Sequence, residues 1–488
     1  MPRPIRFPLI AIVALLATPL QCQTTGILPD TPPGRRLAEL ITILNSGNYD
    51  SIRAYAGDHL SEDLIAGKLD ARVDALMRIH AQSQELTFVR VLSSSRDRVI
   101  AAVGNRLAEM NQALGVSVER RPPHRITMWY RGPANLYREP AGAAQPAESD
   151  IVAAIDSYLD RVAAADVFSG TVLIGREDSI LLLRAVGPAH RDPDVANTTD
   201  TRFNIASVGK LFTAVAVAQL AERALLTYRE PIGRHLGPDW VSHDVASQIR
   251  IEHLLTHRSG LGDFLESEAM LHATAPPSSL ADYRPIIQAE RPQFTPGTRF
   301  QYSNSGFIVL GAVLERISGQ TFTDYFQQHV FAPAGMVGPS DPPRDRAALP
   351  APAFATGYTS HYAASGRNWS DNTGRMANTA ASPAGGQFAS AEDLWRFATA
   401  LRSGALVRDS TWQSLAAPVP VRGGPPRSYG FEITDRGEER RVGHGGSHDG
   451  IGAVLDIYLQ SGYTLVVLSN SDRSAFAVRE KFTSLLMP

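Results

Sequence analysis

The chain has 488 residues but only one cysteine, Cys22, and only three lysines among its 47 basic side chains. A single cysteine excludes a disulfide framework, and it excludes a cysteine-based metal site or a thiol nucleophile in the body of the chain. The net charge is −2, so no basic field exists to hold nucleic acid. No apolar run reaches the roughly 18–20 residues of a membrane span. The remaining composition, 43% hydrophobic and 20% charged, is typical of a globular protein with a sizeable core.

Lysine is scarce because arginine fills the other 44 basic positions. A biased nucleotide composition accounts for such a preference, yet it also makes each remaining lysine informative. Arginine stays charged in proteins, whereas a buried lysine can give up its proton. We expect Lys68 and Lys481 to lie on polar helix faces. Lys210 is therefore the lysine for which a chemical role is worth seeking.

The N-terminus has the parts of an export signal. Arg3 and Arg6 form a charged start, and an apolar stretch of about 14 residues, Phe7–Leu20, follows them. This stretch is too short to span a membrane, so residues 1–22 are expected to be a signal peptide and the mature chain to be secreted or periplasmic. Lipid attachment at Cys22 is the less favoured alternative, because the residue before it is not the small one expected there.

Two polar stretches rich in proline or glycine divide the chain. The first runs from Gln23 to Gly34 and the second from Glu139 to Glu148. They predict a small domain over residues 35–138, a linker over 139–149 and a larger domain over 150–488.

The small domain changes from a helical to a strand pattern along its length. Helices are predicted over Arg35–Leu44, Tyr49–Ala56 and Leu60–His80. Strands are predicted over Leu86–Val91, Val99–Val103 and Arg125–Tyr130. This α+β pattern resembles the nuclear-transport-factor-2-like fold. The domain has no constellation of reactive side chains, so we expect a packing or partner-binding module whose partner is unknown.

The larger domain has strand patterns at both ends and helical patterns between them. After a predicted helix over Asp150–Ala164, strands are expected over Gly170–Arg176 and Ser179–Val186. Further strands are expected over Tyr429–Asp435, Arg440–Gly443, Gly452–Tyr458 and Tyr463–Ser469, before a last helix over Ser474–Leu486. Such an order predicts an antiparallel sheet assembled from the two ends, with a helical region inserted.

A serine and the middle lysine stand three residues apart at the start of an apolar helix predicted over Leu211–Leu226. The spacing between Ser207 and Lys210 brings the lysine within reach of the serine hydroxyl. A buried lysine can lose its charge and take the serine proton, which activates the oxygen as a nucleophile. A helix cap with a polar contact is the alternative interpretation, since Ser-x-x-Lys also arises by chance.

Two further short segments carry groups of the right chemistry. Tyr302-Ser303-Asn304 precedes an apolar helix predicted over Phe307–Ile317, and beside a lysine cation a phenol favours the phenolate and can act as a general base. Gly443–Ser447 places glycines in a strand, where they let a ligand approach the backbone closely. The N–H groups of Ser207 and Ser447 could then form an oxyanion hole.

In this order, the three segments resemble the signature of the serine β-lactamase and penicillin-binding-protein superfamily. The tyrosine points to the branch of class C β-lactamases, DD-peptidases and related esterases. Supporting phrases lie at Ile251–Leu261, at Pro296–Gly319 and at Gly385-Gly386 ahead of Ala391–Leu394. The resemblance implies a β-lactamase/transpeptidase-like α+β fold over about Asp150–Leu486, and a small-molecule or peptide acyl substrate.

The resemblance also implies a role for each residue. Ser207 forms an acyl-enzyme, Lys210 and Tyr302 share the proton transfer, and Asn304 orients the substrate and the lysine. Substrate binding is further assigned to His444, Gly445, Gly446 and Ser447. No cofactor is expected, and no metal, because the chain has no cluster with metal-ligand spacing. His253 and His257, in the first supporting phrase, are expected to be structural.

One position departs from the pattern. The third segment usually begins with lysine, whereas here it begins with His444. An imidazole titrates near pH ~6.5 and is a poor partner for a carboxylate when neutral. We therefore expect esterase, amidase or D-peptidase activity over efficient β-lactam hydrolysis, with preference for anionic substrates rising as pH falls through about 6.5. The alternatives are that His444 only packs or that another cation such as Arg473 binds the carboxylate.

Two other functions compete with this interpretation. A Ser-His-Asp hydrolase is disfavoured because the chain has no Gly-x-Ser-x-Gly elbow. A catalytically silent receptor or binding protein that keeps the pocket is disfavoured because Ser207, Lys210 and Tyr302 are all present.

Overall fold

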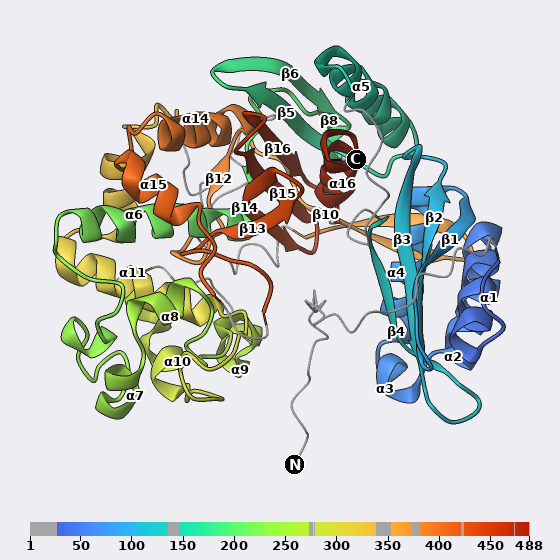
Figure 1. The fold of residues 1–488 in the computed structure, drawn as a ribbon, viewed down its shortest axis with the longest axis horizontal. Helices are drawn as coiled ribbons and strands as arrows, with labels where there is room; N and C mark the ends of the chain where they lie inside the picture. Colours follow the sequence, from blue (N-terminus) through green and yellow to red (C-terminus); the bar gives the residue numbers. More distant parts are fainter. Residues whose placement is uncertain are drawn as a thin grey trace.

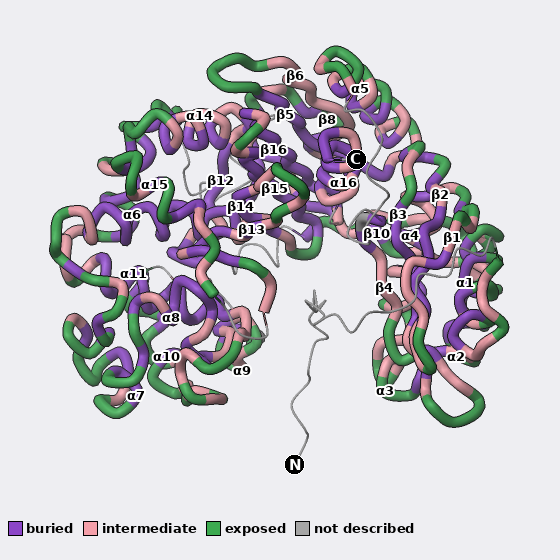
Figure 2. The backbone as a smooth tube through the Cα atoms, in the orientation of Figure 1, coloured by how far each residue is buried: buried purple, intermediate pink, exposed green. Residues whose placement is uncertain are grey.

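The computed structural model describes residues 27–134, 146–272, 277, 279–337, 353–372, 381–420, 424–472 and 474–487. The expected export signal over residues 1–22 and Arg473 lie outside the described residues, as does most of the expected linker. Figure 1 shows a smaller body, coloured blue to cyan, beside a larger one. The most deeply buried backbone runs through the middle of each body (Figure 2).

Within the described range 27–134, the smaller body contains four helices and one antiparallel sheet. The helices are α1 (Pro32–Ser46), α2 (Tyr49–His59), α3 (Glu62–Ile65) and α4 (Leu69–Ser83). The strands are β1 (Leu86–Ser94), β2 (Arg98–Asn105), β3 (Met110–Val118) and β4 (Ile126–Pro133), paired in chain order. Leu37, Leu76 and Val103 belong to one apolar core between the helices and the sheet, so this body has a core of its own.

Two details of the smaller body differ from the predicted pattern. The helix predicted over Leu60–His80 is interrupted between α3 and α4, where Gly67 has a left-handed φ of 63°. Strand β3 was not predicted, because Asn111 and Gln112 interrupt its apolar alternation. The domain boundaries and the nuclear-transport-factor-2-like assignment stay predictions.

The larger body is built on an antiparallel sheet whose strands come from both ends of its chain, as the sequence predicted. Its order is β13-β14-β15-β16-β5-β6. The bounds are β5 (Gly170–Arg176), β6 (Ser179–Val186), β13 (Glu432–Arg436), β14 (Glu439–His448), β15 (Ile451–Tyr458) and β16 (Tyr463–Ser469). Helices α5 (Glu148–Ala164) and α16 (Ala475–Leu486) share an apolar core with one face of this sheet.

The other face of the sheet packs on the helical region. Its helices are α6 (Lys210–Glu222), α7 (His243–Gln248), α8 (Ile251–Leu255), α9 (Glu268–Leu271), α10 (Arg284–Ala289), α11 (Asn304–Ser318), α12 (Phe322–Phe326), α14 (Ala391–Arg402) and α15 (Asp409–Leu415). Short helical turns lie at η2 (Ala206–Gly209), η3 (Ile232–Arg234), η4 (Phe264–Glu266), η5 (Leu280–Tyr283) and η6 (Gln327–Phe331). Short strands lie at β7 (Pro188–Arg191), β8 (Asp194–Ala196), β9 (Phe203–Asn204) and β12 (Phe388–Ala389).

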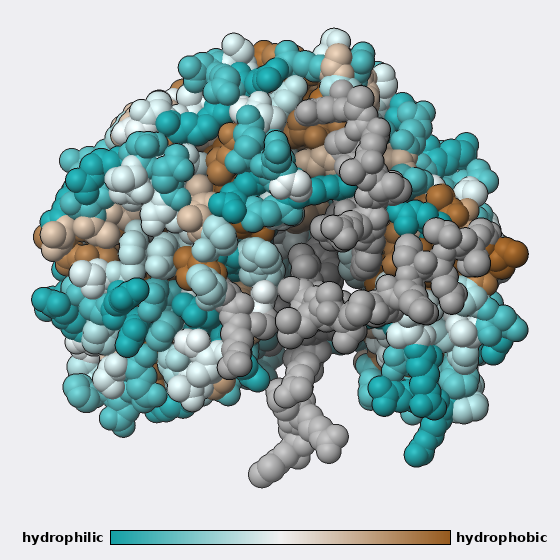
Figure 3. Space-filling view, viewed as in Figure 1, coloured by the Kyte–Doolittle hydropathy of each residue, from teal (hydrophilic) through white to brown (hydrophobic). Residues whose placement is uncertain are grey.

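Helix α6 runs through the middle of this region. Every residue from Lys210 to Leu220 is buried, which explains why its sequence is apolar on all sides. Among the described helices, none is both long and apolar enough to cross a membrane. Hydrophilic side chains cover most of the face drawn in Figure 3, and the apolar areas on it are small and separate.

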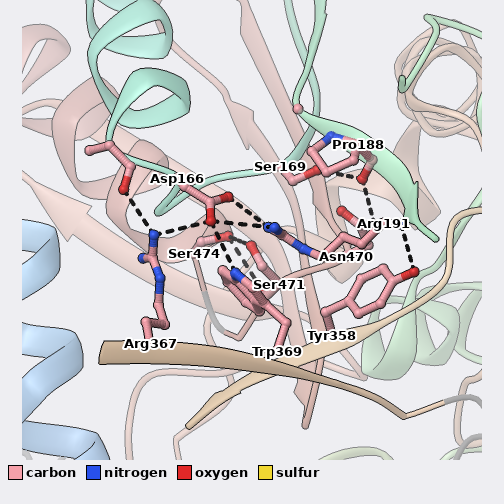
Figure 4. Close-up of polar contacts among 12 residues, drawn as sticks. Asp166, Ser169, Pro188, Arg191, Tyr358, Arg367, Trp369, Asn470, Ser471 and Ser474 are labelled. Atoms are coloured by element: carbon pink, nitrogen blue, oxygen red, sulfur yellow. Dashed lines mark hydrogen bonds and ion pairs between the residues drawn. The ribbon is translucent and has the colours of Figure 1, made fainter. Parts of the chain in front are cut away.

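A hairpin of β10 (Tyr358–Ala363) and β11 (Gly366–Asp371) is anchored to the larger body by Asp166 (Figure 4). The carboxylate of Asp166 accepts hydrogen bonds from Arg191, Arg367 and the Trp369 indole, over distances of 2.6–3.3 Å. The guanidinium of Arg191 also lies 3.9 Å from the centre of the Trp369 ring. These charge-assisted contacts fix the hairpin against the start of the central sheet.

The same hairpin contacts the smaller body. Asp74 of α4 accepts the backbone N–H of Tyr362 at 2.8 Å, and Arg78 donates to the carbonyl of Ser360 at 3.1 Å. Leu107 and Ala108, from the turn between β2 and β3, join the apolar cluster formed with α5 and α16. The two bodies are therefore packed against each other through both polar and apolar contacts.

Lys481 lies at this junction, and the expectation that it occupies a polar helix face was wrong. Its side chain is buried, and its Nζ donates to the carbonyl of Glu109 at 3.2 Å. Burial lowers the pKa of this ammonium below its ordinary value. The smaller body covers the part of α16 that carries Lys481, through Glu109 in the turn between β2 and β3.

A shortened chain that begins at Ala147 is expected to fold and to turn over small activated esters, since no candidate catalytic residue precedes it. Its midpoint of thermal unfolding should be lower than that of the full chain, because the apolar cluster loses Leu107 and Ala108. Calorimetry measures the unfolding midpoint of the two chains, and an ester assay measures their turnover. A folded, monodisperse shortened chain without turnover would show instead that the smaller body shapes the site.

Candidate active site

Ser207 lies in the short helical turn η2, directly before α6. Two glycines from distant segments allow close packing around it. A Cβ at Gly446 would lie 2.8 Å from the backbone nitrogen of Ser207, and a Cβ at Gly385 would overlap the carbonyl of Ala206. Side chains at these two positions would push β14 and the 381–387 segment away from the serine.

The structure brings together the three side chains that the sequence singled out. Lys210 Nζ lies 3.1 Å from Ser207 Oγ, and Tyr302 Oη lies 2.8 Å from the same oxygen. Lys210 comes from the first turn of α6, whereas Tyr302 precedes α11, 95 residues after Ser207. One hydroxyl thus has an amine and a phenol within hydrogen-bond distance, as a serine nucleophile needs.

Lys210 has two other partners, and both are acceptors. Its Nζ donates to Asn304 Oδ1 and to the carbonyl oxygen of Ala384, each at 2.6 Å. The Asn304 amide is oriented by Asp263, which accepts from Nδ2 at 2.7 Å. When Lys210 loses a proton, its remaining N–H groups stay with these acceptors. Its lone pair then faces Ser207, the one partner that carries a proton to give.

Burial adjusts the proton affinity of Lys210. Removal from water disfavours the ammonium and lowers its pKa to about 7, against an opposing attraction from Asp263. A lysine with its ordinary pKa of 10.5 would stay charged near neutral pH, whereas here both protonation states are populated. Lys210 is therefore suited to take a proton at the pH of most cells and fluids.

Tyr302 differs from the expectation of a phenolate. Burial raises the pKa of its hydroxyl above the ordinary value of 10, and this effect exceeds the lowering by the hydrogen bond with Ser207 and by the Arg427 cation. The resting side chain is a phenol that donates to Ser207 Oγ. The phenol can supply a proton, while Lys210 is the group able to accept one.

Strand β14 presents alternate residues to the two sides of the sheet. Gly446 faces Ser207, but a Cβ at Gly445 would lie 2.8 Å from the Phe476 ring of α16. Gly445 and Gly446, both assigned to substrate binding from the sequence, therefore face opposite sides of the sheet, and only Gly446 faces Ser207. Ser447 pairs with Gly452 of β15, at the end of the strand nearest to η2.

His444 faces the candidate site, with its ring centre 6.4 Å from that of Tyr302. The side chain is 1% exposed, and its Nδ1 lies 2.6 Å from the carbonyl of Gly445. Burial lowers its pKa to about 4, although Glu432 opposes that change. The expectation of titration near pH ~6.5 was therefore wrong, because that value belongs to an imidazole in water.

His253 and His257 lie outside the proton-transfer set, in line with the structural role expected for them. His253 Nδ1 accepts the N–H of Arg250 at the start of α8. His257 Nδ1 accepts the N–H of Ser303, and its ring stacks on Tyr302 at 4.2 Å. His257 thereby supports the position of Tyr302 without reaching Ser207.

Two contributors were missed from the sequence: Asp263 and the Ala384 carbonyl. Gly385-Gly386 served only as support for the family resemblance, although two adjacent glycines indicate that another backbone segment can approach closely. Asp263 carries no local signal, since its partner Asn304 lies 41 residues away in the chain. Within the described ranges, no group of three or more histidine, cysteine, aspartate or glutamate side chains could hold a metal ion.

We expect the ratio of kcat/KM for an anionic ester to that for a matched neutral ester to stay constant between about pH 8 and about pH 5.5. His444 gains a proton only as the pH falls toward about 4, so its charge does not change in this window. Steady-state kinetics on the two esters measure the ratio. A ratio that rises several-fold as the pH falls, and becomes flat in His444→Gln, would show that the imidazole titrates near neutrality after all.

Comparisons with known proteins agree with this geometry. Residues 153–486 match the family model described as Beta-lactamase, more than half of the chain. Penicillin-binding protein 4* of Bacillus subtilis is 26% identical over 317 residues, which cover 62% of this chain and 68% of that protein. Esterase EstB of Burkholderia gladioli is 32% identical over 201 residues, which cover 38% and 51%.

Solved structures give the same result. The penicillin binding protein from Bacillus halodurans is 30% identical with a TM-score of 0.59, over 67% of this chain and 98% of that one. A D-amino acid amidase from Ochrobactrum anthropi shares the fold, with a TM-score of 0.56 at 22% identity, over 69% and 98%. From the extent of these matches and the arrangement around Ser207, the chain belongs to the β-lactamase family, with a β-lactamase/transpeptidase-like fold.

Proposed function

We propose that this protein is a serine hydrolase that cleaves esters or amides through an acyl-enzyme on Ser207. The observation that carries the proposal is the placement of Lys210 Nζ and Tyr302 Oη at 3.1 and 2.8 Å from one serine hydroxyl. The amine is buried and has two obligate acceptors as its other partners, so its lone pair is directed at Ser207. A protein that only binds its ligand does not need a buried amine and a phenol placed on one serine hydroxyl.

The proton transfers follow from these contacts. Neutral Lys210 accepts the hydroxyl proton as Ser207 Oγ bonds to the acyl carbon, and the backbone N–H groups of Ser207 and Ser447 stabilise the oxyanion. The leaving group departs with a proton supplied by Tyr302, which is restored from the Lys210 ammonium. Water then attacks the acyl-enzyme and gives a proton to Lys210, and the Lys210 ammonium passes a proton to Ser207 Oγ as the acyl bond breaks. The acid is released, and the Ser207 hydroxyl and neutral Lys210 are restored. Asn304 keeps Lys210 in place throughout.

Neutral His444 directs the choice among acyl substrates. An uncharged imidazole provides no cation for the carboxylate that penicillins and cephalosporins carry. Esters and amides, with D-peptides among the amides, are therefore favoured over efficient β-lactam hydrolysis. The similarity to an esterase supports this choice, and the similarity to penicillin-binding proteins keeps peptides in the set.

The proposal includes export of the chain. Arg3, Arg6 and the apolar stretch Phe7–Leu20 support removal of residues 1–22 and activity in the periplasm or outside the cell. Mass spectrometry of the mature protein, purified from its native compartment, would locate the first residue.

Lys210→Arg is expected to be nearly as inactive as Ser207→Ala. Arginine keeps the charge but cannot accept the proton, so both changes should lower the acylation rate by about 10³ or more. Labelling by a fluorophosphonate probe, followed by mass spectrometry of the Ser207 peptide, measures acylation-type reactivity directly. If Lys210→Arg kept a tenth of the wild-type rate, the general-base role would be wrong. An unlabelled wild-type chain would identify a silent binding protein instead.

The pH dependence of kcat/KM should show an ascending limb centred near pH 7, because the neutral amine exists above the Lys210 pKa of about 7. Below that value, activity on a neutral ester should fall about tenfold per pH unit. Initial rates between about pH 5 and 9, with circular dichroism at each pH to confirm folding, give the profile. An activity that is flat across this range would remove Lys210 from the role of base.

A further inference from the structure

Asp263 directly precedes the turn η4, and a single side chain, that of Asn304, lies between it and Lys210. Asp263 Oδ2 accepts from Asn304 Nδ2 at 2.7 Å, while Asn304 Oδ1 accepts from Lys210 Nζ at 2.6 Å. Asp263 Oδ1 caps η4 by accepting the backbone N–H of Leu265 at 3.1 Å. Both carboxylate oxygens therefore accept from N–H groups, and one of these groups belongs to the amide that holds Lys210.

The hydrogen bonds from Lys210 through Asn304 to Asp263 have a direction. A carboxylate can only accept and an ammonium can only donate, whereas a carboxamide has one accepting end and one donating end. Since Asn304 lies between the two, one orientation of its amide satisfies both neighbours. In the reversed orientation its oxygen would face the carboxylate of Asp263, which repels it. Asp263 therefore selects the orientation in which Lys210 meets an oxygen.

This selection matters most when Lys210 is neutral. A neutral amine has one lone pair, which can take a proton from Ser207 or accept a hydrogen bond from another donor. The carbonyl oxygen of Ala384, which also contacts Nζ, cannot donate. A reversed Asn304 could donate through its NH2 group, and that group would then occupy the lone pair. The carboxylate of Asp263 prevents this reversal.

A second carboxylate, that of Glu290, joins the same loop to the start of α11. It accepts the N–H of Gly262 at 2.7 Å and the hydroxyl of Ser305. Negative charge at the N-terminus of this 15-residue helix is favourable, so both carboxylates support the helix start. Within the described ranges, however, Glu290 has no hydrogen bond to Asn304. The effect of Asp263 on the amide can therefore be separated from its effect on the packing of the loop.

The charge of Asp263 acts in the same sense as its hydrogen bond. Burial lowers the pKa of Lys210 to about 7, and Asp263 is the largest of the opposing effects. Of the other charged groups, Arg427 acts with burial and Glu432 acts against it. The remaining titratable side chains around the amine are neutral, because burial disfavours their ions: His257, His444 and Tyr302. Loss of the Asp263 charge alone would therefore weaken the hold of Lys210 on its proton.

We propose that Asp263 is a positioning residue for the base: by accepting from Asn304, it fixes the end of the amide that faces Lys210 and keeps the lone pair of the neutral amine for Ser207. Asp263 acts through Asn304, since no hydrogen bond in the described part of the chain joins it to Ser207 or to Lys210. The proposal rests on the proposed function of Ser207, although the effect of Asp263 on Lys210 can be measured without catalysis.

The variant Asp263→Asn reverses the direction of the hydrogen bonds with little change in shape. Its side chain has one oxygen, which the N–H of Leu265 occupies, so its NH2 group faces Asn304. Two NH2 groups cannot face each other, and the Asn304 amide is expected to turn its own NH2 group toward Lys210. The negative charge is lost at the same time. Both changes favour the neutral amine.

The scarcity of lysine allows a direct measurement. In a chain labelled with carbon-13 at Cε of lysine, three NMR signals are expected, and the signal missing in Lys210→Arg identifies Lys210. Its titration should be centred near pH 7 in the wild type. In Asp263→Asn the centre should lie about one pH unit lower or more.

Kinetics separate positioning from a general loss of structure. In Asp263→Asn, the ascending limb of kcat/KM for a neutral ester should move below pH 7, in step with the Lys210 signal. The plateau above this limb should fall about tenfold or more, because the reversed amide competes with Ser207 for the lone pair. A damaged fold would lower the plateau without moving the limb, and that result would overturn the proposal.

Glu290→Gln is the matched control, since it removes a carboxylate from the same contact between loop and helix. It should leave the Lys210 titration and the limb unchanged. A Lys210 titration that is the same in Asp263→Asn and the wild type, or that moves equally in Glu290→Gln, would overturn the proposal. If Asp263→Asn does not fold, Asp263→Ser replaces it, because serine is also a good cap for η4 but carries no charge. An unchanged titration in that variant would be equally decisive.

The two measurements distinguish this proposal from the proposed function. If no ester reacts with the wild type, the hydrolase proposal fails, and the NMR titration still tests the effect of Asp263 on Lys210. If esters react and Asp263→Asn keeps the plateau and the Lys210 titration of the wild type, the Asp263 proposal fails alone.

Discussion

The burial of one lysine determines how this site is arranged. Lys210 lies in the apolar centre of the helical region, where its ammonium is stable only if each N–H finds an acceptor. Asn304, the Ala384 carbonyl and Ser207 provide the three acceptors, from three separate segments. A single nitrogen therefore joins α6, α11 and the 381–387 segment. The same burial that requires these partners also brings the pKa of the amine to about 7.

The glycines around Ser207 satisfy a second constraint, which is space. Strand β14 and the loop at Gly385 both come within contact distance of η2, and a Cβ at either position would collide with backbone atoms. Close approach brings the end of β14, with Ser447 and its neighbours, to the proposed nucleophile. The site thus depends on the absence of side chains as much as on the reactive groups.

The charges around the candidate site are distributed differently from what the family resemblance implies for the Gly443–Ser447 segment. The position that usually carries lysine holds a neutral, buried His444. A permanent cation lies nearby on a different segment, as Arg427, beside the ring of Tyr302. Glu432 and Arg479 connect this cation to the far side of the sheet.

The sequence by itself determined the family, a sheet assembled from both ends of the larger domain, and the group of Ser207, Lys210 and Tyr302. These depend on local patterns: periodicity, a spacing of three residues on a helix, and short phrases in a known order. The scarcity of lysine, together with the spacing from Ser207, was enough to single out Lys210.

Only the tertiary structure decided the protonation states and the distant partners. Desolvation sets the pKa values of Tyr302 and His444, and the depth at which a side chain is buried depends on segments hundreds of residues away. For the same reason, Lys481 proved to be buried beneath the smaller body. Asp263 gained its importance from its contact with Asn304, 41 positions away, and no local pattern in the sequence encodes such a contact.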